Sequence, residues 1–206
     1  MNCIFLHGLG QTASCWEKTI GTMDGRANID HPDLFALLRG REVNYSNLYL
    51  AFSEYCKAYS GPLGLCGLSL GGILALQYVI ENPDRVHSAA LIGTQYAMPR
   101  HLLRFQNAVF RMMPARAFEK MGLQKKDLMA LSRSMMDLDF QQELHRINCP
   151  VLVLCGDRDR ANMRASQRLA AMIPHAECKV IRNAGHEINR DAPEALGAEL
   201  NAFFMR

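Results

Sequence analysis

The chain has 206 residues, 49% of them hydrophobic, and a formal net charge of +3. This length allows one domain with a sizeable core and a small insertion, and it excludes a second full domain. The modest charge, with no polybasic tail and no zinc-like spacing, argues against a nucleic-acid-binding protein. We expect neither a metal nor any other cofactor.

The seven cysteines are odd in number and scattered, and several lie inside apolar runs. They do not resemble a disulfide framework or a redox pair, so we expect buried free thiols in a reducing compartment. Met1 leads straight into the apolar segment 3–6 without a basic leader, and no apolar run approaches about 18 residues. These features predict a cytoplasmic protein with no membrane partner.

Short apolar runs alternate with longer stretches of helical periodicity along the chain. The runs are mostly continuous, as in strands that helices cover on both faces. This pattern predicts an α/β fold with a mostly parallel central sheet flanked by helices. The six expected strands are Cys3 to Leu6, Ala27 to Asp30, Leu63 to Cys66, Ser88 to Ile92, Val151 to Cys155 and Cys178 to Ile181.

Helical spacing between the expected strands predicts the covering helices. Apolar residues recur at this spacing over 48–59, behind a cap expected at Ser46. The last helix has the clearest pattern, with Asp191 as its expected N-cap and Pro193 in its first turn. Its buried stripe is expected to comprise Leu196, Leu200, Phe203 and Phe204.

The stretch 99–148 interrupts this alternation and is too long for a plain crossover. It is rich in methionine, a soft and adaptable residue, and its pattern predicts several short helices. We expect these helices to form a small lid over an apolar pocket, inserted into a core made of residues 1–98 and 149–206. The alternative is that the methionines simply pack the helices together.

Basic residues greatly outnumber acidic ones at the start of this insertion. Arg104 and Arg111 belong to this group and are expected to reach a substrate pocket, where they would favour an anionic small molecule. The alternative is a solvated charged face, which is common on protein surfaces.

The pentapeptide Gly67-Leu68-Ser69-Leu70-Gly71 stands between an apolar run and a helical stretch, and this context predicts a nucleophile elbow. A serine hydroxyl is a poor nucleophile unless a tight turn holds it where a base can reach it. Gly67 and Gly71 suit that turn because glycine tolerates both close backbone approach and positive φ. The alternative is a glycine-rich turn with an incidental serine.

Open α/β sheets place their sites where loops leave the carboxyl ends of the strands. The loop after the first expected strand includes Leu9, whose backbone N–H is a candidate oxyanion donor. The amide of Leu70 is the second candidate, because it follows Ser69 at a helix N-terminus where peptide dipoles align.

Three more loops at this edge carry candidate side chains. Asp157 and Asp159 follow the fifth expected strand and His186 follows the sixth, so they would supply an acid and a base. Gln95 and Tyr96 come just after the fourth strand. They are expected to line the substrate pocket, or alternatively to anchor the lid.

Four motifs in this order resemble those of the α/β-hydrolase superfamily, and the resemblance spans nearly the whole chain. They are the His7-Gly8 turn, the elbow 67–72, the Gly156-x-x-Asp159 loop and the Gly185-His186 turn.

This resemblance implies that Ser69 is the nucleophile, that His186 is general base and then acid, and that Asp159 orients the imidazole. Asp157 is the alternative acid. Asp159 is preferred because the family's acid usually stands three residues after this glycine. The remaining histidines, His7 among them, are expected to be structural.

The chain differs from the family in starting at the strand that precedes the His7-Gly8 turn. We therefore expect six strands rather than eight. An edge of the sheet left exposed in this way would favour a homodimer.

A serine at the elbow narrows the expected chemistry. Relatives that open epoxides or displace halide use a carboxylate there, so the resemblance implies a carboxylesterase-like hydrolase of small esters, lactones or thioesters. The same triad also serves carbon–carbon bond hydrolases and lyases that act on keto acids. A receptor that keeps the scaffold without turnover is a third alternative.

Overall fold

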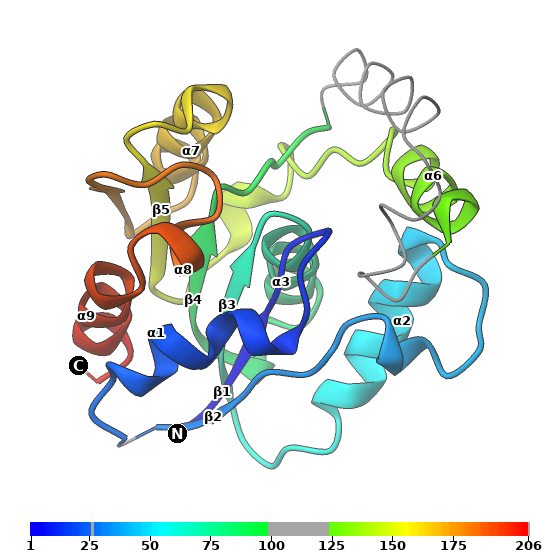
Figure 1. The fold of residues 1–206 in the computed structure, drawn as a ribbon, viewed down its shortest axis with the longest axis horizontal. Helices are drawn as coiled ribbons and strands as arrows, with labels where there is room; N and C mark the ends of the chain where they lie inside the picture. The colour runs from blue at the N-terminus through cyan, green and yellow to red at the C-terminus, as the bar shows by residue number, and fades with distance from the viewer. Residues whose placement is uncertain (26, 99–123, 206) are drawn as a thin grey trace.

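The computed structural model describes residues 1–25, 27–98 and 124–205. Six parallel strands form one sheet in the order β2-β1-β3-β4-β5-β6 (Figure 1), which confirms the predicted α/β fold. The strands are β1 (Asn2–Leu6), β2 (Asn28–Asp30), β3 (Leu63–Leu68), β4 (Val86–Ile92), β5 (Val151–Gly156) and β6 (Ala176–Ile181).

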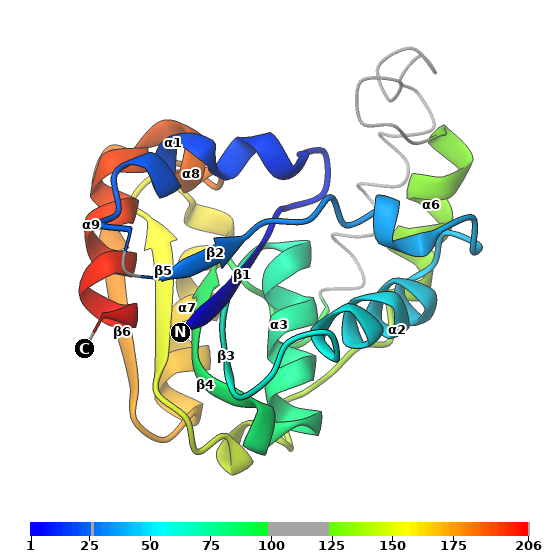
Figure 2. The same ribbon diagram turned by 90° about the horizontal axis from the view of Figure 1, so that it is seen from below.

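Helices cover both faces of this sheet (Figure 2). One face carries α2 (Tyr45–Cys56), α3 (Leu70–Glu81) and α7 (Arg160–Met172). The other carries α1 (Glu17–Gly21), α8 (Ile188–Asp191) and α9 (Pro193–Phe204). The described residues also form four short 3-10 turns: η1 (Ala13–Trp16), η2 (Ala36–Leu38), η3 (Pro83–Arg85) and η4 (Leu144–Arg146).

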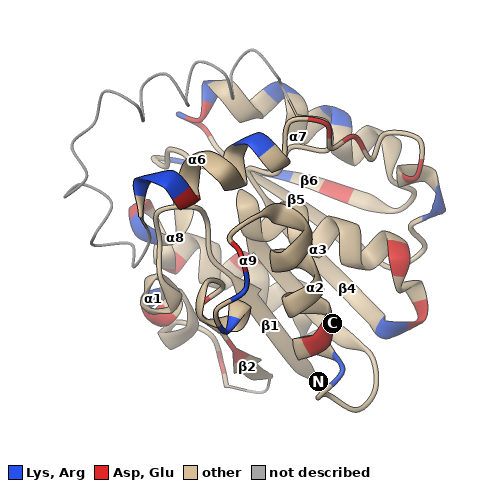
Figure 3. Ribbon diagram, turned by 90° about the vertical axis from the view of Figure 1, so that its right-hand side faces the viewer, with Lys and Arg blue, Asp and Glu red and all other residues tan. Residues whose placement is uncertain are grey.

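Each inner strand contributes alternate residues to two separate cores. In β1, Ile4 and Leu6 belong to the core on the face of α2, α3 and α7, whereas Cys3 and Phe5 belong to the core on the face of α1 and α9. The inner strands β1, β3, β4 and β5 contain no Asp, Glu, Lys or Arg, while both edge strands do (Figure 3). Burial on both faces therefore explains why the strands read as continuous apolar runs.

Two expected helix caps are wrong. Asn44, in extended conformation, caps α2 by accepting a hydrogen bond from the Asn47 amide at 2.8 Å, and Ser46 is already inside the helix. Asp191 ends α8 instead of capping α9, which begins at Pro193 without a side-chain cap. The buried stripe of α9 is as predicted.

The described part of the insertion contains α6 (Lys125–Ser134), which packs against α2. The Tyr45 backbone N–H donates to Ser134 Oγ at 2.8 Å, and an isolated antiparallel bridge joins Ala97 to Asp139. Arg104 and Arg111 lie outside the described residues. The lid over a pocket stays a prediction, as does the homodimer.

All seven cysteines lie in the described part of the chain and are free. Cys3, Cys56, Cys66 and Cys155 are buried as predicted, but Cys15 and Cys149 are only half-buried and Cys178 on the edge strand β6 is exposed. Burial raises the pKa of the Cys3 thiol to about 11, so this thiol stays protonated and unreactive at neutral pH. None of the helices in the described ranges is both long and apolar enough to cross a bilayer.

The reassigned cap of α2 is testable by two alanine substitutions. Asn44→Ala removes the side-chain acceptor and is expected to lower the free energy of unfolding by about 1 kcal/mol. Ser46→Ala, at an exposed position inside the same helix, is expected to leave it within about 0.5 kcal/mol. Urea denaturation of both variants measures the difference, and an equal or larger loss in Ser46→Ala would contradict the assignment.

Candidate active site

Ser69 occupies the sharp turn between β3 and α3. Its backbone has φ 52° and ψ −111°, a conformation that is uncommon for any residue with a side chain. Its N–H donates to the Ile92 carbonyl at 2.8 Å, and its carbonyl accepts from the Ile73 amide at 2.9 Å. The end of β4 and the first turn of α3 therefore hold the serine in place.

The glycines around Ser69 allow backbone segments to meet without intervening side chains. A Cβ at Gly67 would lie 2.3 Å from the Gly71 carbonyl carbon, and one at Gly71 would lie 2.3 Å from the Leu6 carbonyl oxygen. The expected close approach is therefore present. The expectation of positive φ at these glycines is wrong, because Ser69 itself adopts it.

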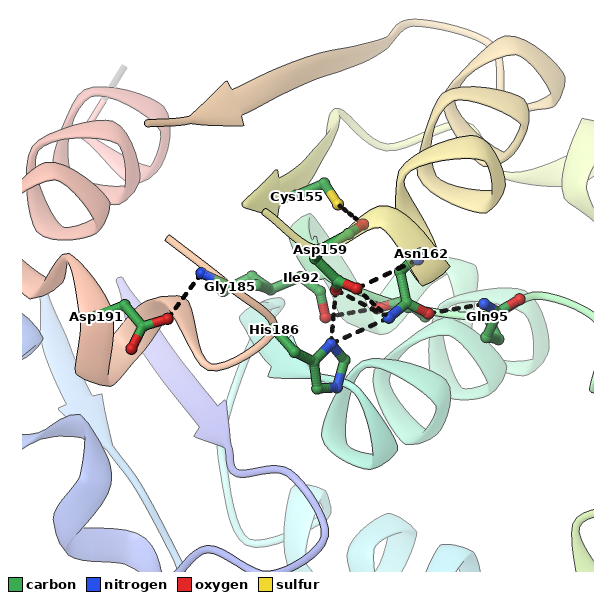
Figure 4. A network of polar contacts seen from close by, with 9 residues as sticks. Ile92, Gln95, Cys155, Asp159, Asn162, Gly185, His186 and Asp191 are labelled. Carbon is green, nitrogen blue, oxygen red and sulfur yellow. Dashed lines mark hydrogen bonds and ion pairs between the residues drawn. The ribbon is translucent and has the colours of Figure 1, made fainter. Parts of the chain in front are cut away.

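Asp159 sits where β5 gives way to α7, and it performs two local tasks. Its Oδ1 caps α7 by accepting from the Asn162 backbone amide at 3.3 Å. Its Oδ2 lies 2.7 Å from His186 Nδ1 (Figure 4). Because the Asp159 side chain is 6% exposed and that of His186 is 40% exposed, the carboxylate is shielded while the imidazole reaches the surface.

The ionised state of Asp159 is favoured despite its burial. Burial disfavours the charge, but hydrogen bonds from His186 and Asn162 outweigh that effect and lower the pKa of the carboxyl. An ionised Asp159 accepts a hydrogen bond from His186 Nδ1–H, and in the neutral imidazole this leaves Nε2 unprotonated. The pair is thus arranged for a base at Nε2.

Backbone hydrogen bonds tie the acid loop to the histidine loop. The Arg158 amide donates to the Ala184 carbonyl at 2.9 Å, and the Ala184 amide donates to Asp157 Oδ1 at 3.1 Å. The carboxylate of Asp191 accepts from the Gly185 amide at 2.7 Å. Asp157 and Asp191 therefore shape the loops, and Asp159 is the acid that contacts His186.

Gly93 places the Asp159–His186 pair next to the elbow. It directly follows Ile92, whose carbonyl holds the Ser69 amide, and its own amide donates to the Leu154 carbonyl at 2.9 Å. A Cβ at Gly93, where φ is +55°, would lie 2.9 Å from His186 Cε1. The imidazole thus lies against Gly93, the residue after Ile92, and any side chain at position 93 would displace the imidazole.

The turn after β1, which carries the candidate oxyanion donor Leu9, is held from two sides. His7 is buried and structural, as predicted: its Nδ1 donates to the Gly8 carbonyl at 2.9 Å, and its Nε2 accepts from the Leu34 amide at 3.0 Å. Gln11 Oε1 accepts from the Gly8 amide at 3.2 Å.

This turn is also joined to the helix after His186. Gln11 Nε2 donates to Asn189 Oδ1, and Asn189 Nδ2 donates back to Gln11 Oε1, both at 3.2 Å. Both side chains are buried. Leu70, the other candidate donor, is the first residue of α3, where helix amides lack an intrahelical partner.

Gln95 contacts Asn162, a partner that the sequence does not predict. Its Nε2 donates to Asn162 Oδ1 at 2.7 Å, and Asn162 in turn contacts Asp159. The Tyr96 carbonyl accepts from the Phe140 amide at 2.8 Å, so this segment also anchors part of the insertion. In residues 1–25, 27–98 and 124–205, no His, Cys, Asp or Glu cluster is arranged to hold a metal ion.

The close contact below His186 predicts a selective effect of substitution. Gly93→Ala and Gly61→Ala both put a side chain at positive φ, and each is expected to lower stability by about 1 kcal/mol or more. Only Gly93→Ala meets an imidazole, since a Cβ at Gly61 has no neighbour within 4 Å. We expect the His186 Cε1–H NMR resonance to shift in Gly93→Ala and to stay in place in Gly61→Ala; an unmoved resonance in both would contradict the described contact.

Comparisons with known proteins identify relatives of this chain. The chain is similar to carboxylesterase YbfK of Bacillus subtilis, with 23% identity over 74% of this chain and 62% of that protein. It is also similar to 2-succinyl-6-hydroxy-2,4-cyclohexadiene-1-carboxylate synthase of Salmonella arizonae, with 26% identity over 92% of this chain and 88% of that protein. The chain thus spans less than two thirds of the carboxylesterase and most of the synthase.

Solved structures share the fold. An esterase from Thermogutta terrifontis superimposes with a TM-score of 0.79 at 18% identity, over 100% of this chain and 89% of that one. MenH from S. aureus superimposes with a TM-score of 0.81 at 17% identity, over 100% and 93%. A model of the alpha/beta hydrolase family matches residues 3–199. The chain therefore belongs to the alpha/beta hydrolase family.

Proposed function

We propose that this protein is a serine hydrolase that cleaves a small carboxylic ester, lactone or thioester through an acyl-enzyme on Ser69. The observation that carries the proposal is the 2.7 Å contact between Asp159 Oδ2 and His186 Nδ1, beside the strand end that holds the Ser69 elbow. The carboxylesterase named among the relatives supports the same class of substrate.

In the proposed reaction, His186 Nε2 removes the Ser69 hydroxyl proton as the oxygen attacks the carbonyl carbon. Asp159 keeps the Nδ1 proton in place and stabilises the imidazolium that forms. The amides of Leu9 and Leu70 donate to the oxyanion, Leu70 from the positive end of α3. His186 then protonates the leaving group, and a water activated by the same imidazole hydrolyses the acyl-enzyme.

A second candidate is cleavage of a carbon–carbon bond, or elimination, on a keto acid. Similarity to the 2-succinyl-6-hydroxy-2,4-cyclohexadiene-1-carboxylate synthase, at greater coverage than to the carboxylesterase, favours this alternative. In the elimination, His186 and Ser69 would move a proton without an acyl-enzyme. Arg104 and Arg111 are proposed to bind an anionic group of the substrate in either reaction.

Kinetics on a short aryl ester test the proposed function. The wild type is expected to turn over repeatedly, with a burst of phenol equal to the enzyme concentration wherever deacylation is slower than acylation. Ser69→Ala should lower kcat by at least about a thousandfold, because the remaining site keeps only binding and oxyanion contacts.

The matched control is Ser46→Ala, the same substitution at an exposed position on α2, which should retain wild-type kcat. A folded Ser69→Ala variant that hydrolyses the ester at the wild-type rate would refute the proposal. Proton abstraction from a keto acid without ester turnover would favour the second candidate. Saturable binding without turnover of either would indicate a receptor.

A further inference from the structure

The side chain of Asn162 lies between the Asp159 carboxylate and Gln95 (Figure 4). Its Nδ2 donates to both carboxylate oxygens, at 2.9 Å to Oδ1 and 2.8 Å to Oδ2. From the other side, Gln95 Nε2 donates to Asn162 Oδ1 at 2.7 Å. One chain of hydrogen bonds thus runs from the segment after β4 to the acid that contacts His186.

The direction of these hydrogen bonds is set by the charge at one end. An ionised carboxylate only accepts, so the NH₂ group of Asn162 must face Asp159 and its carbonyl oxygen must face away. That oxygen then needs a donor, and the Gln95 amide supplies one. Each bond polarises the next toward the anion, so Gln95 strengthens the contact between Asn162 and Asp159.

Asn162 also restricts the imidazole directly. Its Nδ2 lies 3.1 Å from His186 Nδ1, and both atoms direct hydrogens toward Asp159. Two donors cannot bond to each other, so they lie side by side and share the carboxylate. The Asn162 amide therefore holds both carboxylate oxygens, with Oδ2 facing His186.

We propose that Gln95 and Asn162 are positioning residues that orient Asp159, and through it His186, for the proposed hydrolysis. Asn162 acts on the carboxylate itself, and Gln95 acts through Asn162. Because Gln95 belongs to the segment after β4, the pair also links that segment to the acid. This proposal rests on the proposed function, and it replaces a substrate-lining role for Gln95.

Single and double alanine variants test this order of action. Because a small misplacement of a catalytic group can cost about a hundredfold in rate, Asn162→Ala is expected to lower kcat by about ten- to hundredfold. Its backbone amide still donates to Asp159, the cap of α7, which preserves the helix start. Gln95→Ala should lower kcat less, and KM should change by less than about twofold in both variants.

Non-additive effects of the two substitutions on kcat distinguish a positioning role from a general loss of packing. Gln95→Ala should have no further effect in the Asn162→Ala background, because its only proposed route to Asp159 is gone. The acidic limb of the kcat/KM profile should move to higher pH in Asn162→Ala, since a carboxylate with one donor fewer stabilises imidazolium more. Gln167→Ala, which removes an exposed amide from the same helix α7, is the matched control and should match wild type.

Three outcomes would overturn the proposal. The first is an unchanged kcat in Asn162→Ala. The second is a Gln95→Ala effect that persists undiminished in the double variant. The third is a rise in KM with unchanged kcat in Gln95→Ala, which would place Gln95 on the substrate.

An NMR readout keeps this test separate from the proposed function. The proton between His186 Nδ1 and Asp159 Oδ2 should give a downfield resonance, assigned by its loss in His186→Ala. We expect Asn162→Ala to broaden or shift this resonance and Gln167→Ala to preserve it, whether or not the wild type cleaves esters. An inactive wild type with this response refutes the proposed function alone, whereas an active wild type without it refutes the positioning role.

Discussion

The backbone conformation of Ser69 is the constraint on which the site depends. A residue with a side chain at φ 52° and ψ −111° carries strain of about 1–3 kcal/mol, which persists only where the surroundings enforce it. Here β3 and α3 are almost fully buried, and the Ser69 amide is bonded to the Ile92 carbonyl. Because Gly67 and Gly71 have no side chains, the backbones of β3, α3 and β1 can contact one another at this turn. In the proposed site, this turn would present the Ser69 hydroxyl at the N-terminus of α3, where the first amides lack intrahelical partners.

The other loops of the site depend on the same sheet edge. Parallel pairing brings the ends of β4, β5 and β6 together, so Gly93, Asp159 and His186 meet although they are far apart in the sequence. Backbone bonds between the acid and histidine loops make them one unit, and the buried Gln11–Asn189 pair joins the turn after β1 to the helix after His186. The proposed nucleophile, base, acid and oxyanion donors therefore rest on one interconnected framework.

Sequence patterns predicted the parts of this framework that depend on local residue type. Continuous apolar runs predicted the strands, whereas the preference for Asp159 over Asp157 came from the resemblance to the α/β-hydrolase superfamily. The roles of Asp191 and Asn162 escaped prediction for different reasons. Asp191 stands before Pro193 and resembles an N-cap, yet its carboxylate instead binds the Gly185 amide in the preceding loop. The Asn162 partner Gln95 is 67 positions away, and no local pattern encodes a contact that only sheet pairing creates.

Covalent labelling of the native protein with a fluorophosphonate, followed by peptide mass spectrometry, tests directly whether Ser69 is an activated nucleophile. The reagent reacts with a serine only when a base and oxyanion donors activate it. We expect one phosphonyl adduct, on Ser69, that disappears when the protein is unfolded beforehand and is strongly reduced in His186→Ala. Folded wild-type protein that carries no adduct on Ser69 would contradict its role as an activated nucleophile.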